Sequence, residues 1–226
     1  VANPEKASFL QRFFKTGKGQ YAEGDLFLGL VVPLTRSIVK ANKNTPLSEI
    51  ELLIQSKYHE ARLCALLILV EQFKKATEPK RGVLYDFYLN HIDYINNWDL
   101  VDISCPYIVG NYLLDKDRSR LYELAESKHL WSQRIAVVST IAFIRKGEFL
   151  DTFALAGKLL NHEHDLMHKA IGWMLREVGK KDRAALTDFL ERNASLMPRT
   201  SLRYAIEHYP ETDRKAFLSV KQIKNK

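Results

Sequence analysis

A loosely repeated helical segment constrains the fold of this chain more than any other feature of its sequence. Four times, a basic residue stands at the start of an apolar run rich in small side chains, and these residues are Arg62, Arg134, Lys169 and Arg203. They recur at about 35 residues, with one unit skipped between the first two. In the skipped unit, Asp102-Ile103 takes the place of Arg134-Ile135. A period of roughly 34–47 residues with two helices per unit is typical of an α-solenoid.

The intervening segments carry apolar residues at helical spacing and fit the first helix of each pair. We predict such helices over 45–53 (with Ser48 as its cap), 117–127, 149–160 and 182–193. Another helix is predicted at the N-terminus, where Asn3 would cap and Pro4 would occupy the first turn. Because strand-period runs are absent, the sequence predicts an all-α fold. We expect an α-solenoid of HEAT-like helix pairs, one domain over residues 1–226, whose second helices line a concave face.

The chain is basic, since 34 Lys and Arg residues stand against 27 Asp and Glu residues, a net charge of +7. A polyanion is a natural partner for such a chain. The basic residues of the repeat would then form a positive stripe along a concave basic groove. Alternatively, each pairs with an acid of the neighbouring repeat as a structural staple. The stretch from Lys215 to Lys226 is expected to be a frayed basic end.

Several function classes find no support in the sequence. No apolar run approaches the ~18 residues that span a bilayer, and the longest, residues 63–70, is predicted to be a buried helix segment. The first residues hold no apolar core of a signal peptide. Cys64 and Cys105 lie in apolar helical patterns, as reduced core thiols of a cytosolic protein do. We also expect no metal site at His162, His164 and His168, because the metalloprotease order and a distal third ligand are missing.

Trp98 and Asp102 are the most informative pair of residues. Asn97 is predicted to be a helix N-cap whose side chain satisfies a backbone N–H. A helix that begins there places Trp98 and Asp102 four residues apart on one face. Asp102 precedes the apolar run 103–109, where a carboxylate is costly to desolvate unless it is paired, capped or faces a cleft. A carboxylate beside an indole suggests a site that stabilises positive charge.

Structural alternatives for this pair stay open. Trp98 is also explained as a core residue between repeats, and Asp102 as a cap or a partner of Arg134. Asp99, in the first helical turn, is expected to serve the helix dipole.

Four stretches of the chain resemble the DNA alkylation repair enzymes with HEAT-like repeats, the AlkD-type alkylpurine DNA glycosylases. They are residues 27–36, 97–102, 131–134 and 169–177. The specific parts are Trp-Asp-x-x-Asp in the second stretch and Lys-Ala-x-Gly-Trp-x-x-Arg-Glu in the fourth. The resemblance implies hydrolysis of the N-glycosidic bond of cationic N3- or N7-alkylated purines. It also implies that duplex DNA lies in the groove with the lesion largely left in the duplex, and that no metal or organic cofactor is needed.

The resemblance also implies roles for individual residues. Asp102 matches the essential carboxylate, and Trp98 and Trp173 match two aromatic residues that flank the sugar of the damaged nucleotide. The expected DNA-binding residues, together with those of the positive stripe, are Arg134, Arg176, Arg36, Lys169, Arg203 and Tyr21. The family often has polar residues where Val31 and Val32 stand in this chain.

The chemistry suits these residue types. An alkylated purine that carries a positive charge is already a good leaving group, and bond cleavage moves the charge onto the deoxyribose. A fixed carboxylate stabilises that charge and can orient or deprotonate the attacking water. Indole faces attract cations, and arginines bind phosphates with two hydrogen bonds. We therefore expect a monomeric, cytoplasmic, monofunctional DNA N-glycosylase that associates with the nucleoid through alkylated double-stranded DNA and binds no membrane. A non-catalytic HEAT-repeat scaffold and a binder of damaged or branched DNA are the alternatives.

Overall fold

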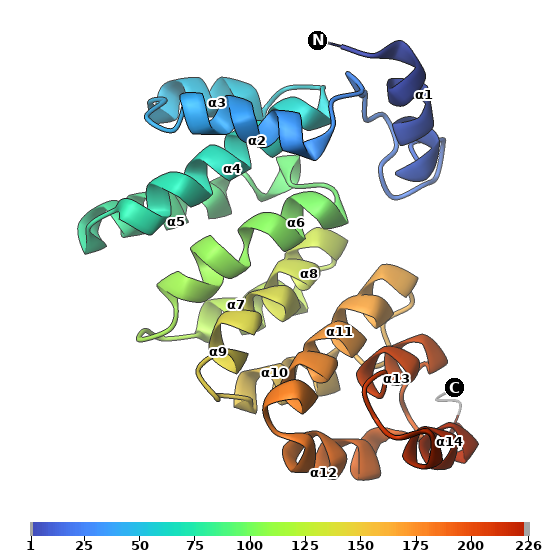
Figure 1. The fold of residues 1–226 in the computed structure, drawn as a ribbon. Helices are drawn as coiled ribbons and strands as arrows, with labels where there is room; N and C mark the ends of the chain where they lie inside the picture. The colour runs from blue at the N-terminus through green and yellow to red at the C-terminus, as the bar shows by residue number, and fades with distance from the viewer. Residues whose placement is uncertain (1, 224–226) are drawn as a thin grey trace. The chain divides into compact units, whose positions relative to one another are not determined.

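The protein is all-helical in a computed structural model, which describes residues 2–223 (Figure 1). Within this range there is no β-strand, and the one β-bridge joins Leu26 and Tyr58. The predicted all-α class is therefore confirmed. The chain divides into two compact units, unit 1 (residues 1–112) and unit 2 (residues 113–226). The assignment of a single domain stays a prediction.

Unit 1 is built around its long helix α4 (His59–Lys75), which packs against the helices before and after it. The predicted apolar segment 63–70 forms the middle of α4, where nearly every side chain is buried. The other helices of unit 1 are α1 (Pro4–Phe13), α2 (Val32–Ala41), α3 (Leu47–Ile54), α5 (Glu78–Asn90), the 3-10 helix η1 (Ile92–Tyr94), α6 (Trp98–Ser104) and the π-helix η2 (Pro106–Gly110).

Two helix starts of unit 1 test the predicted N-caps, and one of the two is confirmed. The Asn3 side chain accepts a hydrogen bond from the Lys6 N–H at 3.0 Å, and Pro4 opens α1, as predicted. The predicted cap at Ser48 is wrong. Pro46 occupies the N-cap of α3 in an extended conformation, so the helix begins at Leu47 and Ser48 lies inside its first turn.

Helix α6 begins at Trp98, directly after Asn97, as predicted. The expected capping bond of Asn97 is wrong, however. Its side chain is fully buried, and neither amide atom has a hydrogen-bond partner within the described range. The Asp99 carboxylate instead accepts a bond from the Leu100 N–H at 2.8 Å. The helix ends at Ser104, just before Pro106 opens η2.

Unit 2 is built around α11 (Asp165–Lys181), which packs against α8, α9, α10, α12 and α13. The helices predicted over 117–127, 149–160 and 182–193 are confirmed as α7, α10 and α12. Asp182 caps α12 by accepting a bond from the Ala185 N–H at 2.9 Å. The remaining helices of unit 2 are α7 (Ser119–Glu126), α8 (Leu130–Ser139), α9 (Ile141–Ile144), α10 (Leu150–Lys158), α12 (Arg183–Asn193), α13 (Arg199–Ala205) and α14 (Glu211–Ser219).

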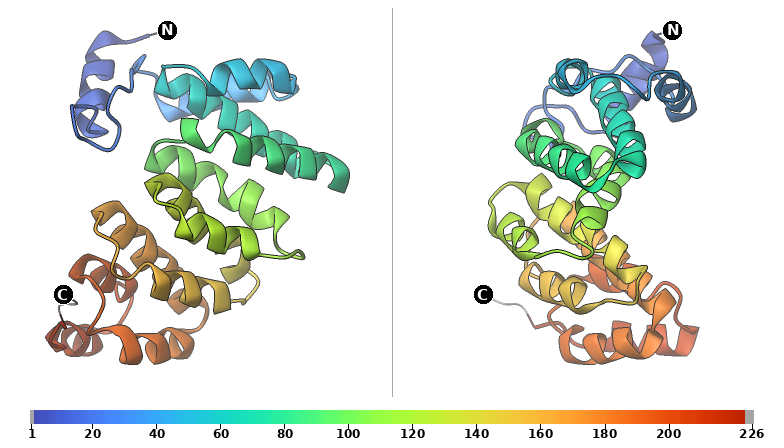
Figure 2. Two further views of the ribbon diagram at one scale, coloured as in Figure 1. Left: turned by 180° about the vertical axis from the view of Figure 1, so that it is seen from behind. Right: turned by 90° about the vertical axis from the view of Figure 1, so that its left-hand side faces the viewer.

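The predicted packing of helices in pairs is confirmed for three pairs, because α3 packs on α4, α7 on α8 and α10 on α11 (Figure 2). The repeated residues lie on the second helices: Arg62 on α4, Asp102 on α6, Arg134 on α8, Lys169 on α11 and Arg203 on α13. The concave basic groove stays a prediction.

The predicted fraying from Lys215 onward is wrong at its start, since Lys215 lies within α14. Lys224 and Lys226 fall outside the described residues. Every helix in the described part of the chain is too short or too polar to cross a lipid bilayer.

Candidate functional site

Trp98 and Asp102 lie one turn apart on α6, and both side chains are half-buried. The indole Nε1 of Trp98 donates a hydrogen bond to the Tyr21 hydroxyl at 3.3 Å. Its ring stacks on Phe14 with 5.5 Å between the centroids. Tyr21, one of the expected DNA-binding residues, thus lies beside Trp98. The indole is therefore held by packing on one side, which agrees with the structural alternative for Trp98.

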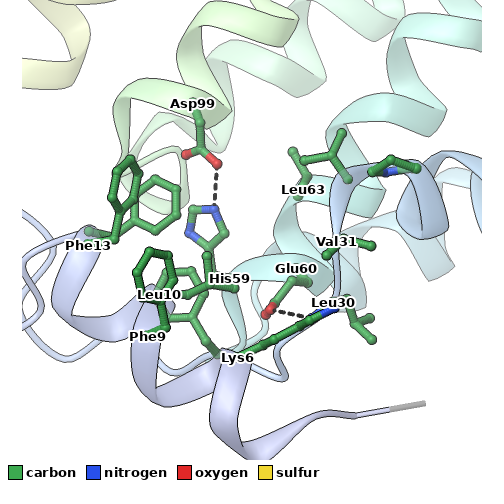
Figure 3. Close-up of a pocket in the computed structure, with 14 residues that line it drawn as sticks. Lys6, Phe9, Leu10, Phe13, Leu30, Val31, His59, Glu60, Leu63 and Asp99 are labelled. Carbon is green, nitrogen blue, oxygen red and sulfur yellow. Dashed lines mark hydrogen bonds and ion pairs between the residues drawn. The ribbon is translucent and has the colours of Figure 1, made fainter.

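A cluster of charged residues that the sequence did not reveal lies next to α6. His59, at the start of α4, is almost fully buried and contacts two carboxylates, of which Figure 3 shows that of Asp99. Its Nε2 lies 2.8 Å from Asp99 of α6, and its Nδ1 lies 3.4 Å from Asp25 of the loop after α1. Asp99 therefore does more than serve the helix dipole, because it joins α6 to α4.

The protonation state of His59 follows from these contacts. Burial alone would disfavour the imidazolium, but the hydrogen bonds to Asp25 and Asp99 outweigh it and raise the pKa of His59 to about 9. Burial likewise opposes ionisation of Asp25. The bond from His59 and the charge of Arg62 overcome that effect and lower the pKa of Asp25. At neutral pH the imidazolium thus donates to two carboxylates.

Arg62 completes this cluster and is a structural staple, so its expected place in a positive stripe is wrong. The guanidinium is 4% exposed, and Nη2 lies 2.7 Å from Asp25. The same nitrogen donates to the Asn96 side-chain oxygen at 3.1 Å, and Asn96 donates to Asp25 at 2.9 Å. Breaking a buried ion pair costs several kcal/mol, ~3–5, because it leaves an unpaired buried charge. Arg62 therefore ties the residues before α6 to α4.

An apolar cavity of about 500 Å³ lies between α1 and the starts of α2 and α4 (Figure 3). Phe9 and Phe13 of α1 face Val31 and Val32 across it, and all four are exposed. Glu60 lines the cavity, and its carboxylate accepts three backbone N–H bonds, from residues 28, 29 and 30, at 2.9 to 3.1 Å. This carboxylate fixes the turn that leads into α2.

Arg36 lies in a different recess of unit 1. It lines a cavity of about 270 Å³ together with Lys40, Lys43, Glu71 and Lys75, and neither Trp98 nor Asp102 lines that cavity. A hydrogen bond from Lys74, with its charge and those of Lys75 and Arg36, lowers the pKa of Glu71. The basic side chains outnumber the single acid here, which suits an anionic partner.

In unit 2, Trp173 and Arg176 both project from α11 and are half-buried. Gly172 allows α11 to approach α13 closely, because a Cβ at this position would lie 2.5 Å from the Ser201 carbonyl oxygen. The Arg176 Nη1 donates to the carboxylate of Glu207. Because Glu207 is 52% exposed, this ion pair is weak in water. A phosphate oxygen can therefore compete for the guanidinium.

The other predicted DNA-binding residues of unit 2 differ in exposure. Arg134 is 4% exposed and donates to the Leu166 carbonyl oxygen at 2.6 Å, which favours the structural alternative for this residue. Lys169 is half-buried and pairs with Asp165 at 2.7 Å, one turn earlier on α11. Arg203 is exposed on α13.

The histidines near residue 165 serve the local structure. The His164 ring caps α11 by accepting a bond from the Leu166 N–H at 3.1 Å. His162 bonds to Gln133 at 2.8 Å, and His168 bonds to the His162 carbonyl oxygen. Within the described range, no three His, Cys, Asp or Glu residues are grouped so that they could hold a metal ion.

Comparisons with known proteins agree with this fold. The family model described as DNA alkylation repair enzyme matches residues 1–209. Among solved structures, a predicted DNA alkylation repair enzyme from Enterococcus faecalis superimposes with a TM-score of 0.70 at 17% sequence identity. The match covers 93% of this chain and 97% of that one, and at this identity it supports the fold alone. A comparison with curated proteins gives no match.

The family model covers most of the chain, including the stretches around Trp98 and Trp173 on which the resemblance was based. This protein therefore belongs to the DNA alkylation repair enzyme family.

Proposed function

We propose that this protein is a monofunctional DNA glycosylase that hydrolyses the N-glycosidic bond of N3- or N7-alkylated purines in duplex DNA. One observation carries the proposal beyond the family assignment. Asp102 and Trp98 are half-buried and one turn apart on the same short helix. A carboxylate and an indole in this relation suit a reaction that develops positive charge on a sugar.

Asp102 supplies the electrostatic part of the proposed mechanism. An N3- or N7-alkylated purine leaves as a neutral base, so no strong general acid is required. As the bond to the base lengthens, the deoxyribose becomes an oxocarbenium-like cation that the Asp102 carboxylate stabilises. The same carboxylate then accepts a proton from, or orients, the water that attacks the anomeric carbon.

Trp98 and Trp173 supply the aromatic part. An indole face attracts a developing cation by roughly 0.5–2 kcal/mol, depending on how far the pair is desolvated. The contacts of Trp98 with Tyr21 and Phe14 hold its ring in one orientation before DNA binds. We assign Trp173 a similar contact with the damaged nucleotide.

The proposed phosphate contacts come from exposed or weakly paired cations. Arg36 of unit 1 and Arg176, Lys169 and Arg203 of unit 2 meet this condition. We propose an indirect role for Arg134, because its bond to the Leu166 carbonyl oxygen holds the first turn of α11.

The test is the identity of the bases that the protein releases. Alkylated duplex DNA is incubated with the protein, and the free bases are identified by mass spectrometry. We expect N7-methylguanine and N3-methyladenine to be released, whereas the neutral base hypoxanthine stays attached in a matched duplex. DNA binding without release of any base would support the non-catalytic alternative. Equal release of N7-methylguanine and hypoxanthine would refute the dependence on leaving-group charge.

A further inference from the structure

The start of α6 is held by side chains from other parts of unit 1. Asn96, just before the helix, bonds to both Arg62 and Asp25. Asp99, in its first turn, bonds to His59 at 2.8 Å. Trp98 lies between these two anchors, and Asp102 lies one turn after them. The position of both candidate site residues is therefore set by the cluster around His59.

The helix depends on tertiary contacts for its orientation, and besides the cluster these include the buried Leu100 and Val101 and a hydrogen bond between Ser104 and Tyr88 at 2.9 Å. It is only seven residues long, and a helix this short is marginal by itself in water. Its N-cap residue Asn97 makes no capping bond, and Pro106 follows within two residues of its end. Tertiary contacts must therefore hold it, and the cluster supplies charged ones.

The charges of the cluster balance only when His59 is protonated. Asp25 from the loop after α1 and Asp99 from α6 face the imidazole, and Arg62 faces it from α4. Two carboxylates then meet two cations. The rings of Phe14 and Phe27 stack on the imidazole at 5.1 and 4.7 Å and exclude water from it. Charged hydrogen bonds in such a dry setting hold their geometry tightly.

We propose that His59 and Asp99 are positioning residues for the reaction, which hold α6 so that Trp98 and Asp102 meet the damaged nucleotide in the productive geometry. This inference rests on the proposed function of Asp102. It predicts that loss of the His59–Asp99 bond slows the chemical step while the affinity for DNA is retained. A misplacement of about 1 Å at a reacting group can cost as much as ~100-fold in rate.

The test compares Asp99→Asn with a matched control, Asp151→Asn. The two carboxylates are similarly exposed, at 16% and 15%, and each makes a short bond to a cationic side chain. Asp151 pairs with Arg118 at 2.7 Å in unit 2 and has no place in the proposed site. In the Asp99→Asn variant, the amide oxygen can still accept the Leu100 N–H, while the amide nitrogen replaces the oxygen that accepts from His59, so the substitution removes the His59 bond and the negative charge.

Three quantities are measured for each variant well below its unfolding temperature. They are the single-turnover rate of N7-methylguanine release at saturating protein, the dissociation constant for the duplex, and the hydrogen exchange of α6 amides. For Asp99→Asn we expect release at least ~10-fold slower, an affinity within about twofold of the parent and faster exchange in α6. Asp151→Asn should leave all three unchanged. If Asp99→Asn does not fold, His59→Gln removes the same bond from the other side.

The remaining outcomes separate this inference from the proposed function. Unchanged α6 exchange in Asp99→Asn, or faster exchange with an unchanged rate of release, overturns the positioning role. Slower release without faster exchange also overturns it, because Asp99 would then act directly. If the parent protein releases no base, the proposed function fails. The exchange of α6 then still decides whether the cluster holds this helix.

Discussion

Raising the pH from about 7 to about 9.5 should destabilise the folded protein through His59. Its pKa is raised from 6.5 to about 9 by the carboxylates of Asp25 and Asp99 against the opposing effect of burial. A group whose folded pKa lies above its unfolded value binds protons more tightly in the folded state. Its stabilisation is complete below the unfolded value and is lost as the pH rises through the folded value.

The size of the effect follows from the two pKa values. Each unit of difference corresponds to 1.36 kcal/mol, so the shift of His59 contributes about 3 kcal/mol in total. About 2 kcal/mol of this is lost between pH 7 and pH 9.5. Solvent screening reduces it little, because the His59 side chain is only 2% exposed.

The chosen pH range separates His59 from most of the other shifted groups, and Cys64, whose pKa is raised by burial, is present in both the parent protein and His59→Gln, so the comparison of the two removes its effect. The pKa of Asp25 is lowered, so its contribution is lost only on acidification. Burial lowers the pKa of His162, which therefore stays neutral throughout the range. Tyrosines and lysines titrate at about pH 10 and above, which sets the upper limit of the experiment.

The assay is equilibrium unfolding in urea, followed by circular dichroism at several pH values, for the parent protein and His59→Gln. The free energy of unfolding of the parent should fall by about 2 kcal/mol over the range, whereas that of His59→Gln should fall by less than about 0.5 kcal/mol. Parallel pH dependences for the two proteins would refute the assignment of the imidazolium to His59.

Three further substitutions test the packing and the turns that support the site. Gly172→Ala should destabilise unit 2 by about 1–3 kcal/mol, seen as a lower melting temperature, because its Cβ would lie 2.5 Å from the Ser201 carbonyl oxygen. Gly29→Ala should release α1 and speed its cleavage in limited proteolysis, since Gly29 has φ +78° and its Cβ would lie 2.1 Å from the Asn3 carbonyl oxygen. Glu60→Gln should lower the urea midpoint of unfolding by the equivalent of about 1–3 kcal/mol, because an amide has one acceptor oxygen for three backbone N–H groups.

The sequence predicted the helices well because their signals are local. Apolar residues at helical spacing located α7, α10 and α12, and Asn3 with Pro4 located the start of α1. At the start of α3, two residues were possible N-caps, and the predicted one was wrong. Ser48 is a favourable N-cap residue, but Pro46 already has the extended conformation of a cap, and the helix begins directly after it.

The charged cluster could not be predicted, because it depends on which distant residues meet. Asp25, His59 and Asp99 stand 34 and 40 residues apart, far more than the three or four residues that separate neighbours on one helix. A polar His59 at the start of a buried helix was the single available signal. The burial of Arg62 could not be predicted for the same reason, since it depends on Asp25 from an earlier loop. The sequence therefore identified Arg62 as repeated but not whether it faces solvent.

The candidate site was predicted from the sequence in part. The Trp98–Asp102 spacing placed both residues on α6 correctly, because the spacing within one helix is fixed. The contact of Trp98 with Tyr21 joins residues 77 positions apart and was not predicted, because the family resemblance gave Tyr21 only as a DNA-binding residue.

The central claim, that Asp102 stabilises the sugar cation during base release, is tested most directly by Asp102→Asn. The rate of N7-methylguanine release is measured under single-turnover conditions, beside the dissociation constant for the same duplex. The account predicts release slower by ~10²–10³-fold, as for other fixed electrostatic groups, with the affinity for DNA nearly unchanged. Release by Asp102→Asn at the rate of the parent protein would contradict it.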